Sequence, residues 1–513
     1  MIAPDKEPDV TLETDVIVVG GGGSGLAAAI EARNIGRRVI LIEKNPKLGG
    51  STARSVGSIT ATNTPHQLRK GILDSPDDHF DDMGKFCERV GLQDNLVLRR
   101  ILIDNVSETL RWLMSMGVVF HGPLTEPPHR KPRMHNVLPN SRAYIYHLSK
   151  RARAIGVDIR LNMGLREVLI EGGQARGVIC ETDGQSIRIN ARGGVVLATG
   201  DFAGNEDMRR NHLPPLVAPA RPINPTNTGD GHRAVVKAGG RMMNSQHFVG
   251  GVRFPPPPEK WIMKIPPLKI VTSFMSWSLD NMPSWLLRPF IMSFLTTVLQ
   301  SSPNLYKQGA LLINKEGKRF NDEPASPAQN LAKQPGGVAY ILLDGKLAEK
   351  FSAPPFQIST APGIAFAYLP DYRRTRKDIY HEGRTLDELA RKIGVNPAAL
   401  NETLAAYNAG KADGDASPRG NRPTLDRGPY IALGPVHHYI TFSDSGVGVT
   451  DRHEVIGADG EPIQGLFAVG FIGMGGMLLE GLGHHLGWAF TSGRRAGRHA
   501  AFRVVTDDMP PAG

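Results

Sequence analysis

The chain has 513 residues, more than one ordinary hydrophobic core accommodates, so two domains are expected. Hydrophobic residues make up 40% of the sequence and charged residues 21%, which is typical of a folded globular protein and argues against a disordered one. The formal net charge is +10, but the basic residues form no long run and only 6% of residues are aromatic, which disfavours nucleic-acid binding.

Cysteine usage and the N-terminal residues bear on the compartment. The two cysteines, Cys87 and Cys180, form no CxxC pair, so we expect neither a metal cluster nor a disulfide framework. Few cysteines, and a polar stretch over residues 1–15 without the apolar core of a secretory signal, predict a cytoplasmic protein. The longest uncharged stretch, residues 289–306, includes Pro303 and several polar residues, so no membrane span is predicted.

The first elements form a βαβ unit. Residues 15–19 are a short β-branched run bounded by glycine, which predicts a buried parallel strand. A helix is expected from residue 24 to 34, and a second buried strand over 38–42 ends at Glu43.

Helices and strands then alternate along the chain. We expect helices within 76–118 and over 143–155, a loop over 123–139, a hairpin over 157–182 that turns at Gly172-Gly173, and a buried strand over 194–198. Toward the C-terminus we expect two helices within 384–412, a buried strand over 465–470 and a last helix over 488–502.

The composition changes between residues 245 and 300. A four-proline run at 255–258 is followed by Trp261, Trp277 and Trp285, and by further phenylalanines. This segment predicts the start of a separate domain that covers a substrate. Its apolar residues also leave open an extra hydrophobic core, or a patch for peripheral contact with a membrane or a partner.

The chemistry begins with the glycine-rich turn at residues 20–25. The pattern follows a strand and opens a helix, the context that dinucleotide binding requires. Gly20 allows the tight turn, Gly22 lets a pyrophosphate approach the backbone, and Gly25 lets the helix pack on the strand. The helix N-terminus offers free N–H groups to phosphate, and Glu43 can accept hydrogen bonds from ribose hydroxyls. The turn therefore predicts a bound dinucleotide.

The residues after Glu43 distinguish FAD from NAD through a resemblance. Residues 44–52, Lys-Asn-Pro-Lys-Leu-Gly-Gly-Ser-Thr, resemble the EKxxxxGG(S/N)(S/T) stretch of the flavoprotein family that contains the fumarate reductase and succinate dehydrogenase flavoprotein subunits and the 3-ketosteroid Δ1-dehydrogenases. The resemblance implies that this stretch lies along the pyrophosphate and flavin of FAD, with residues 55–58 continuing under the flavin.

Further motifs extend the resemblance over most of the chain. Residues 198–202 are similar to the family's ATGGF turn, 228–231 to its TGDG, 317–323 to its GxRFxNE, 465–470 to its GLYAAGE strand and 481–489 to its GxGxxxGxA. The resemblance implies an α/β fold: a Rossmann-like FAD-binding domain of the glutathione-reductase type, discontinuous, with an inserted α+β substrate-covering domain. We place the first part of the FAD domain at 1–245, the covering domain at 246–429 and the second part at 430–513.

The resemblance also assigns the cofactor contacts. Some members bind FAD covalently through a histidine near the Gly-Gly-Ser stretch, but the first histidine here is His66, so non-covalent FAD is predicted. The residues expected to bind FAD are Gly20, Gly22, Gly23, Ser24, Gly25, Glu43, Lys44, Gly50, Ser51, Thr52, Ser55, Gly57, Thr199, Gly200, Asp230, Gly470 and Leu486.

The reaction follows from the same resemblance. The family moves a hydride between flavin and a carbon beside a carbonyl, with a proton exchanged at the neighbouring carbon. The arginine acid of fumarate reductases has no counterpart after 317–323, Glu480 stands where their carboxylate-binding arginine is, and Leu479 replaces the tyrosine of the ketosteroid dehydrogenases. The candidate catalytic residues are therefore His438, Glu480, His485 and Tyr439, with no metal expected.

The sequence thus predicts an FAD-dependent dehydrogenase or ene-reductase acting on the C–C bond beside a carbonyl. The missing carboxylate clamp favours an uncharged, apolar ketone, such as a cyclic or steroid-like one. An external electron acceptor or donor is expected. Two alternatives stay open: a fumarate-reductase-like enzyme acting on a carboxylate, favoured by the +10 charge, and an FAD electron-transfer subunit that needs a partner.

Overall fold

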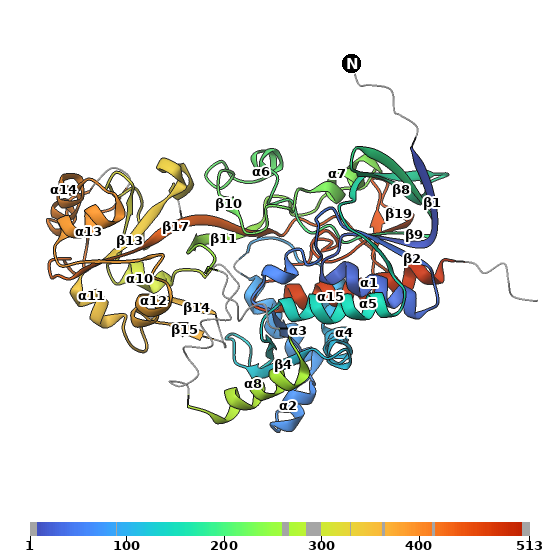
Figure 1. The fold of residues 1–513 in the computed structure, drawn as a ribbon, viewed down its shortest axis with the longest axis horizontal. Helices are drawn as coiled ribbons and strands as arrows, with labels where there is room; N and C mark the ends of the chain where they lie inside the picture. Colours follow the sequence, from blue (N-terminus) through green and yellow to red (C-terminus); the bar gives the residue numbers. More distant parts are fainter. Residues whose placement is uncertain are drawn as a thin grey trace, which may run out of the picture.

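A computed structural model describes residues 8–88, 90–258, 266–283, 299–328, 330–361, 365–412 and 416–504. Figure 1 shows two regions side by side, one around the first strands and the last helix and the other around residues 300–430. Each region contains a sheet of its own, and each sheet has its own buried hydrophobic cluster.

The first sheet has eight strands in the order β18-β19-β8-β9-β1-β2-β6, with β7 paired to β8. β1 (Val10–Val19) lies in its middle and pairs in parallel with β2 (Val39–Ile42) and β9 (Gln185–Leu197). The other strands are β6 (Asp158–Arg160), β7 (Gly164–Glu171), β8 (Gln174–Thr182), β18 (Glu454–Ile456) and β19 (Pro462–Ala468). Since β19 also pairs in parallel with β9, the two ends of the chain share one sheet.

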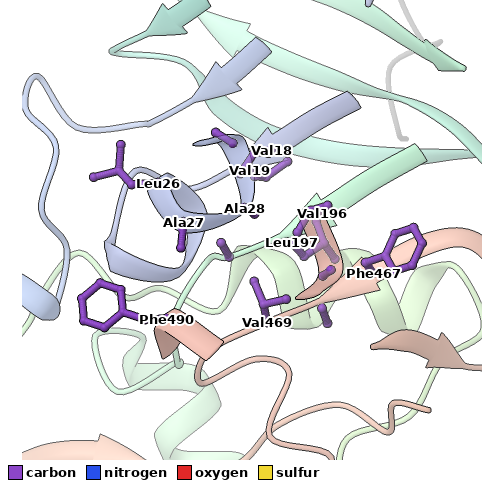
Figure 2. Close-up of a cluster of buried hydrophobic side chains, with 14 of the residues drawn as sticks. Val18, Val19, Leu26, Ala27, Ala28, Val196, Leu197, Phe467, Val469 and Phe490 are labelled. Carbon is purple, nitrogen blue, oxygen red and sulfur yellow. The ribbon is translucent and has the colours of Figure 1, made fainter. Parts of the chain in front are cut away.

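Three helices pack together beside this sheet: α1 (Gly23–Asn34), α5 (Arg142–Ala154) and α15 (His484–Phe502) (Figure 1). Figure 2 shows side chains of β1, β9 and β19 meeting those of α1 and of Phe490 in α15. The backbones of α1 and α15 also approach each other closely at two glycines of α15. A Cβ atom at Gly493 would lie 2.3 Å from the carbonyl oxygen of Ser24, and one at Gly497 would lie 2.2 Å from that of Ala28.

The second sheet has six strands: β10 (Arg221–Pro222), β11 (Phe248–Arg253), β12 (Leu311–Asn314), β13 (Ala339–Leu343), β16 (Tyr380–Gly383) and β17 (Tyr430–Ser443). Its associated helices are α10 (Pro303–Lys307), α11 (Gly345–Lys350), α12 (Leu369–Thr375), α13 (Leu386–Ile393) and α14 (Pro397–Asn408). β17 pairs with β10, β11, β13 and β16, and it runs from this region toward the first one (Figure 1).

The remaining elements surround these two sheets. The helices are α2 (Pro65–Arg69), α3 (Pro76–Cys87), α4 (Leu96–Ser115), α6 (Glu206–His212), α7 (Asp230–Lys237) and α8 (Lys269–Asn281). The strands are β3 (Ser58–Thr60), β4 (Val119–Leu124) and β5 (Met134–Leu138), which form a small sheet, and the pair β14 (Ser359–Ala361) and β15 (Ala365–Ala367). Short 3₁₀ turns lie at Thr52–Arg54, Leu331–Lys333 and Pro335–Gly337.

The predicted α/β class with a discontinuous first domain is confirmed. The hairpin that turns at Gly172-Gly173 is present as β7 and β8. The loop predicted over 123–139 is wrong in part, because β5 runs through it and pairs with β3 and β4. The last helix begins at His484, four residues before its predicted start at 488, because Gly483 takes the left-handed conformation (φ 86°) just before it.

The domain boundaries remain a prediction, and strand pairing bears on one of them. β17 begins at residue 430, where the sequence placed the return to the first domain, yet it pairs within the second sheet as far as Ser443. Of the apolar segment between 245 and 300, Trp261 and Trp285 lie outside the described residues. Among the described residues, no helix is both long and apolar enough to cross a membrane.

The glycines of α15 give a stability test. Replacing a helical glycine by alanine ordinarily stabilises by about 1 kcal/mol. For Gly497→Ala we expect the opposite sign, a loss of about 2 kcal/mol or more, because the added Cβ meets the α1 backbone. Denaturant unfolding measures it. The matched control is Gly84→Ala in α3, whose Cβ meets no backbone atom and only the terminal Nη1 of Arg99, at 3.1 Å; equal effects of the two substitutions would contradict the packing argument.

Candidate active site

A cavity of about 730 Å³ lies at the carboxyl ends of the parallel strands of the first sheet. The residues that follow β1, β2 and β9 line it (Gly20, Glu43 and Ala198). The opposite wall is formed by β11, by the end of β17 and by residues 299–303. The cavity therefore lies where an open α/β sheet ordinarily binds its ligand, and the second sheet covers it.

The glycine-rich turn has the geometry that its sequence predicts. A Cβ at Gly25 would lie 1.9 Å from the Gly20 carbonyl oxygen, so this glycine is required for packing of the helix on the strand. At Gly22 the nearest atom to a Cβ position is 4.0 Å away, so its backbone is open to the cavity. The first backbone N–H groups of α1 follow directly, and they can bind a phosphate.

Glu43 is held in place by the turn. Its Oε2 accepts a hydrogen bond from the Gly21 backbone N–H at 2.8 Å, and its Oε1 accepts two from Asn45, at 2.9 Å from the backbone and 2.7 Å from the side chain. The carboxylate is buried and lines the cavity. A carboxylate oxygen has more than one lone pair, so ribose hydroxyls can still donate to it.

Two further groups of side chains border the predicted cofactor site. Lys44 Nζ lies 2.6 Å from Asp230 Oδ2, which joins the end of β2 to the start of α7. Ser51 Oγ accepts hydrogen bonds at 3.0 Å from the side-chain amides of both Asn224 and Asn227. These contacts link segments far apart in sequence around one cavity.

The donor set of the cavity fits a dinucleotide. Every predicted FAD-binding residue lines it except Gly25, whose part is the packing described above. The Thr199 hydroxyl is buried without a hydrogen-bond partner among the described residues, so it is available to a ligand. On the far side, Gly483 precedes α15, and a Cβ there would lie 2.5 Å from the Thr60 backbone nitrogen. The N-terminal turn of α15, the positive end of its dipole, therefore borders the cavity.

The structure divides the four candidate catalytic residues. Glu480 and His485 line the cavity. His438 and Tyr439 are not among its described lining residues: His438 is buried beside Gly250, with its Nδ1 unpartnered among the described residues, and burial lowers its pKa to about 4. Tyr439 packs against His437, with ring centroids 5.8 Å apart. The catalytic roles of His438 and Tyr439 therefore stay predictions, and neither side chain is among the described residues that line this cavity.

A network of two histidines and two carboxylates adjoins the cavity. His485 Nε2 lies 3.0 Å from Asp444 Oδ1, and His247 Nε2 lies 3.4 Å from Asp444 Oδ2 and 3.1 Å from Glu480 Oε1. Although burial opposes it, the two histidines hold the pKa of Asp444 below its usual value. The hydrogen bonds that His247 donates to Asp444 and Glu480 raise its pKa to about 9, so His247 is an imidazolium at neutral pH.

Two more ionisable side chains line the cavity. Burial raises the pKa of Glu126 to about 7; its Oε1 accepts a hydrogen bond from the Leu482 N–H at 2.9 Å, and its Oε2 has no partner among the described residues. Burial lowers the pKa of Arg253, at the end of β11, to about 10, so it stays protonated at neutral pH. The cavity thus contains an acid that titrates near neutrality and a half-buried guanidinium.

Sequence reasoning missed His247, Asp444, Glu126 and Arg253. Glu126 stood in a segment predicted to be a loop, and Arg253 stood just before the proline run, where no motif marks it. Asp444 and His247 meet only because β11 and β17 pair antiparallel, with Phe248 opposite Ser443. Residues 247 and 444 follow next to this pair, so the pairing makes them neighbours. The strand register itself could not be predicted from the sequence.

The family model described as "FAD binding domain" matches residues 15–253 and 290–478. The chain therefore belongs to this family of FAD-binding proteins, and the prediction of FAD as its cofactor is confirmed. It is an FAD-dependent oxidoreductase of the class that acts on carbon–carbon bonds. The match leaves out the segment that contains α8 and ends before α15.

Curated relatives resemble the chain over nearly its whole length. It is 27% identical over 507 residues to the fumarate reductase (cytochrome) of Shewanella frigidimarina, covering 95% of this chain and 77% of that protein. It is 26% identical over 470 residues to the NADH:fumarate oxidoreductase of Klebsiella pneumoniae (strain 342). That match covers 89% of this chain but only 44% of the relative, so the chain spans less than half of the longer protein.

Solved structures show the same fold. The open conformation of a flavocytochrome c3 fumarate reductase gives a TM-score of 0.72 at 24% identity, over 97% of this chain and 79% of that one. The 3-ketosteroid Δ1-dehydrogenase of Sterolibacterium denitrificans gives 0.65 at 20% identity, over 96% and 99%. Both branches that the sequence resembles therefore share this architecture.

Non-covalent attachment of FAD is tested by acid precipitation. We expect the yellow colour to pass into the supernatant, because none of the predicted FAD-binding residues that line the cavity is a histidine, cysteine or tyrosine. Absorbance of supernatant and pellet measures it. Flavin that stays in the washed pellet would contradict the prediction.

The His247 network predicts a pH-dependent stability. The folded-state pKa of His247 is raised to about 9, so its stabilising contribution is complete below about 6.5 and is lost as pH rises through about 9. We expect His247→Gln to cost on the order of 1–2 kcal/mol at pH 6 and much less at pH 10. Unfolding at both pH values measures it. A difference that does not shrink with rising pH would show that the imidazolium is not the stabilising form.

Proposed function

We propose that this chain desaturates or reduces the carbon–carbon bond beside the carbonyl of a largely apolar, uncharged substrate, such as a cyclic or steroid-like ketone. The observation that carries the proposal is one half-buried guanidinium, Arg253, in a substrate wall that also carries six apolar side chains. The apolar residues of that wall are Val249, Leu299, Pro303, Phe442, Phe471 and Leu479.

Arg253 is suited to bind the carbonyl oxygen. Hydride transfer at a carbon conjugated to a carbonyl places negative charge on that oxygen. A guanidinium that stays protonated in a partly desolvated site can stabilise this charge. FAD, when bound, supplies the site that accepts or donates the hydride.

His485 is suited to move the proton. Asp444 holds its Nε2 at 3.0 Å, which orients the ring and leaves the second ring nitrogen for exchange with the substrate. The ring also packs against Phe442 and Phe471, with centroids 4.2 and 5.2 Å away. Glu480 binds His247 and so belongs to the supporting network that balances the charge of Asp444. Proton transfer is therefore assigned to His485 rather than to His438.

The charges of the cavity disfavour a dicarboxylate. Two carboxylate substituents call for two cationic contacts, and Arg253 is the arginine that the described residues of β11, β17 and 299–303 place in the substrate wall. Glu480 also lines the cavity and would repel a second carboxylate. One cationic contact beside apolar side chains fits a single carbonyl.

A carboxylate substrate is the second candidate, and Arg253 itself favours it. A guanidinium can form a bidentate pair of hydrogen bonds with a carboxylate. A substrate with one carboxylate would therefore need no second cation. The fumarate oxidoreductase names of two relatives support this alternative. The third candidate is an FAD subunit that passes electrons to or from a protein partner.

A dye-coupled turnover assay separates these candidates. With an artificial electron carrier, we expect turnover of a cyclic ketone or a 3-ketosteroid, because Arg253 provides one polar contact. Fumarate and succinate serve as the comparison. Turnover of the dicarboxylates but not of any ketone would refute the lead proposal, and flavin reduction without turnover of either would favour the electron-transfer subunit.

Substitutions test the assigned residues. We expect Arg253→Met to lower kcat/KM by about 10²–10³-fold and His485→Asn by about 10²-fold or more, since each removes a contact made in the transition state. Steady-state kinetics and FAD content measure both. The matched control is His438→Gln, a buried histidine outside the cavity, which should change kcat/KM by less than about threefold. A loss of activity in the control with FAD retained would return His438 to the mechanism.

A further inference from the structure

Helix α8 has its apolar side chains on the outside. Ile270, Phe274 and Trp277 follow one another at helical spacing and are 86%, 64% and 56% exposed. The rings of Phe274 and Trp277 stack with centroids 6.0 Å apart. The buried residues of this helix are instead the polar Thr272 and Ser278. A helix that packs only against its own protein has the reverse arrangement, so α8 presents an apolar face to a surface outside the fold.

The neighbouring α2 and the turn after it extend this apolar face. Leu68 is 59% exposed and Leu73 is 78% exposed. The two elements are joined by Lys70 and Asp280, whose charged atoms lie 4.0 Å apart, and Figure 1 shows α2 and α8 at the same end of the molecule. We call the set Leu68, Leu73, Ile270, Phe274 and Trp277 the apolar end.

Basic side chains accompany the apolar end. Arg69 and Lys70 lie between its two leucines in sequence, and Lys269 begins α8 next to Ile270; all three are exposed. The exposed acid on α8 is Asp280, which pairs with Lys70. Large apolar side chains with an aromatic pair, bordered by lysine and arginine, are the composition that binds the surface of an anionic bilayer.

We propose that the apolar end docks on an anionic bilayer surface, with α8 lying in the plane of the interface. The headgroups would meet Arg69, Lys70 and Lys269, while the aromatic pair would enter the boundary of the acyl chains. This inference stands on exposure and charge, and it does not depend on the proposed reaction.

The path of the chain connects this surface with the cavity. The segment that contains α8 leaves the cavity wall after Arg253 and returns to it at Leu299, where the Phe254 N–H donates to the Leu299 carbonyl at 3.0 Å.

Sedimentation with lipid vesicles tests the proposal on the FAD-loaded protein. We expect binding to phosphatidylcholine vesicles that contain phosphatidylglycerol, and weaker binding to phosphatidylcholine alone. The double variant Phe274→Ser, Trp277→Ser should bind at least about tenfold more weakly, because two large apolar side chains no longer enter the interface. The matched control is Phe502→Ser, a 69% exposed aromatic residue at the end of α15, which should bind like the wild type.

A charge variant guards against misfolding of the serine variant. Lys70→Glu, Lys269→Glu leaves every apolar side chain in place and should remove the preference for anionic vesicles. FAD content and turnover of a water-soluble substrate should be unchanged in all variants. No sedimentation of the wild type with either vesicle, or equal binding by the variants, would overturn the proposal. The proposal would also be overturned if the apolar end instead joined two copies of the chain, that is, if the wild type formed a dimer and the serine variant did not.

Discussion

The cavity depends on a close backbone contact between the first and last helices of the described fold. α15 approaches α1 so closely at Gly493 and Gly497 that a single methyl group at either position would overlap a carbonyl oxygen of α1. That approach places the N-terminus of α15 and the preceding turn opposite the glycine-rich turn at residues 20–25. Two segments more than 450 residues apart thereby line one site, and the second sheet covers that site.

Opposite charges are paired in the network that adjoins the cavity. Asp444 is fully buried, which alone would be costly, and His485 and His247 offset that cost from opposite oxygens. Glu480 binds His247 in turn, and it also lines the cavity, where its carboxylate disfavours a second anionic group on the substrate. Arg253 is then the cation positioned to meet a developing negative charge on the substrate, and this separation of roles underlies the proposed reaction.

The sequence predicted the cofactor half of the site far better than the substrate half. FAD contacts come from glycines, Glu43 and the residues of one βαβ unit, and their spacing along the chain determines their geometry. The substrate half is built by strand pairing over long separations. His438 was a candidate catalytic residue, but the cavity is lined by Thr441 and Phe442 of the same strand, β17, and not by His438. His247 and Asp444 could not be paired without the register of β11 and β17.

The central claim is that Arg253 binds a single carbonyl beside FAD, and a flavin absorbance titration tests it most directly. The FAD-loaded wild type and Arg253→Met are titrated anaerobically with an uncharged cyclic enone and with fumarate. The account predicts a saturable spectral change with the enone in the wild type, weakened about tenfold or more in Arg253→Met, and little response to fumarate. Tight binding of fumarate that depends on Arg253, with no response to the enone, would contradict it.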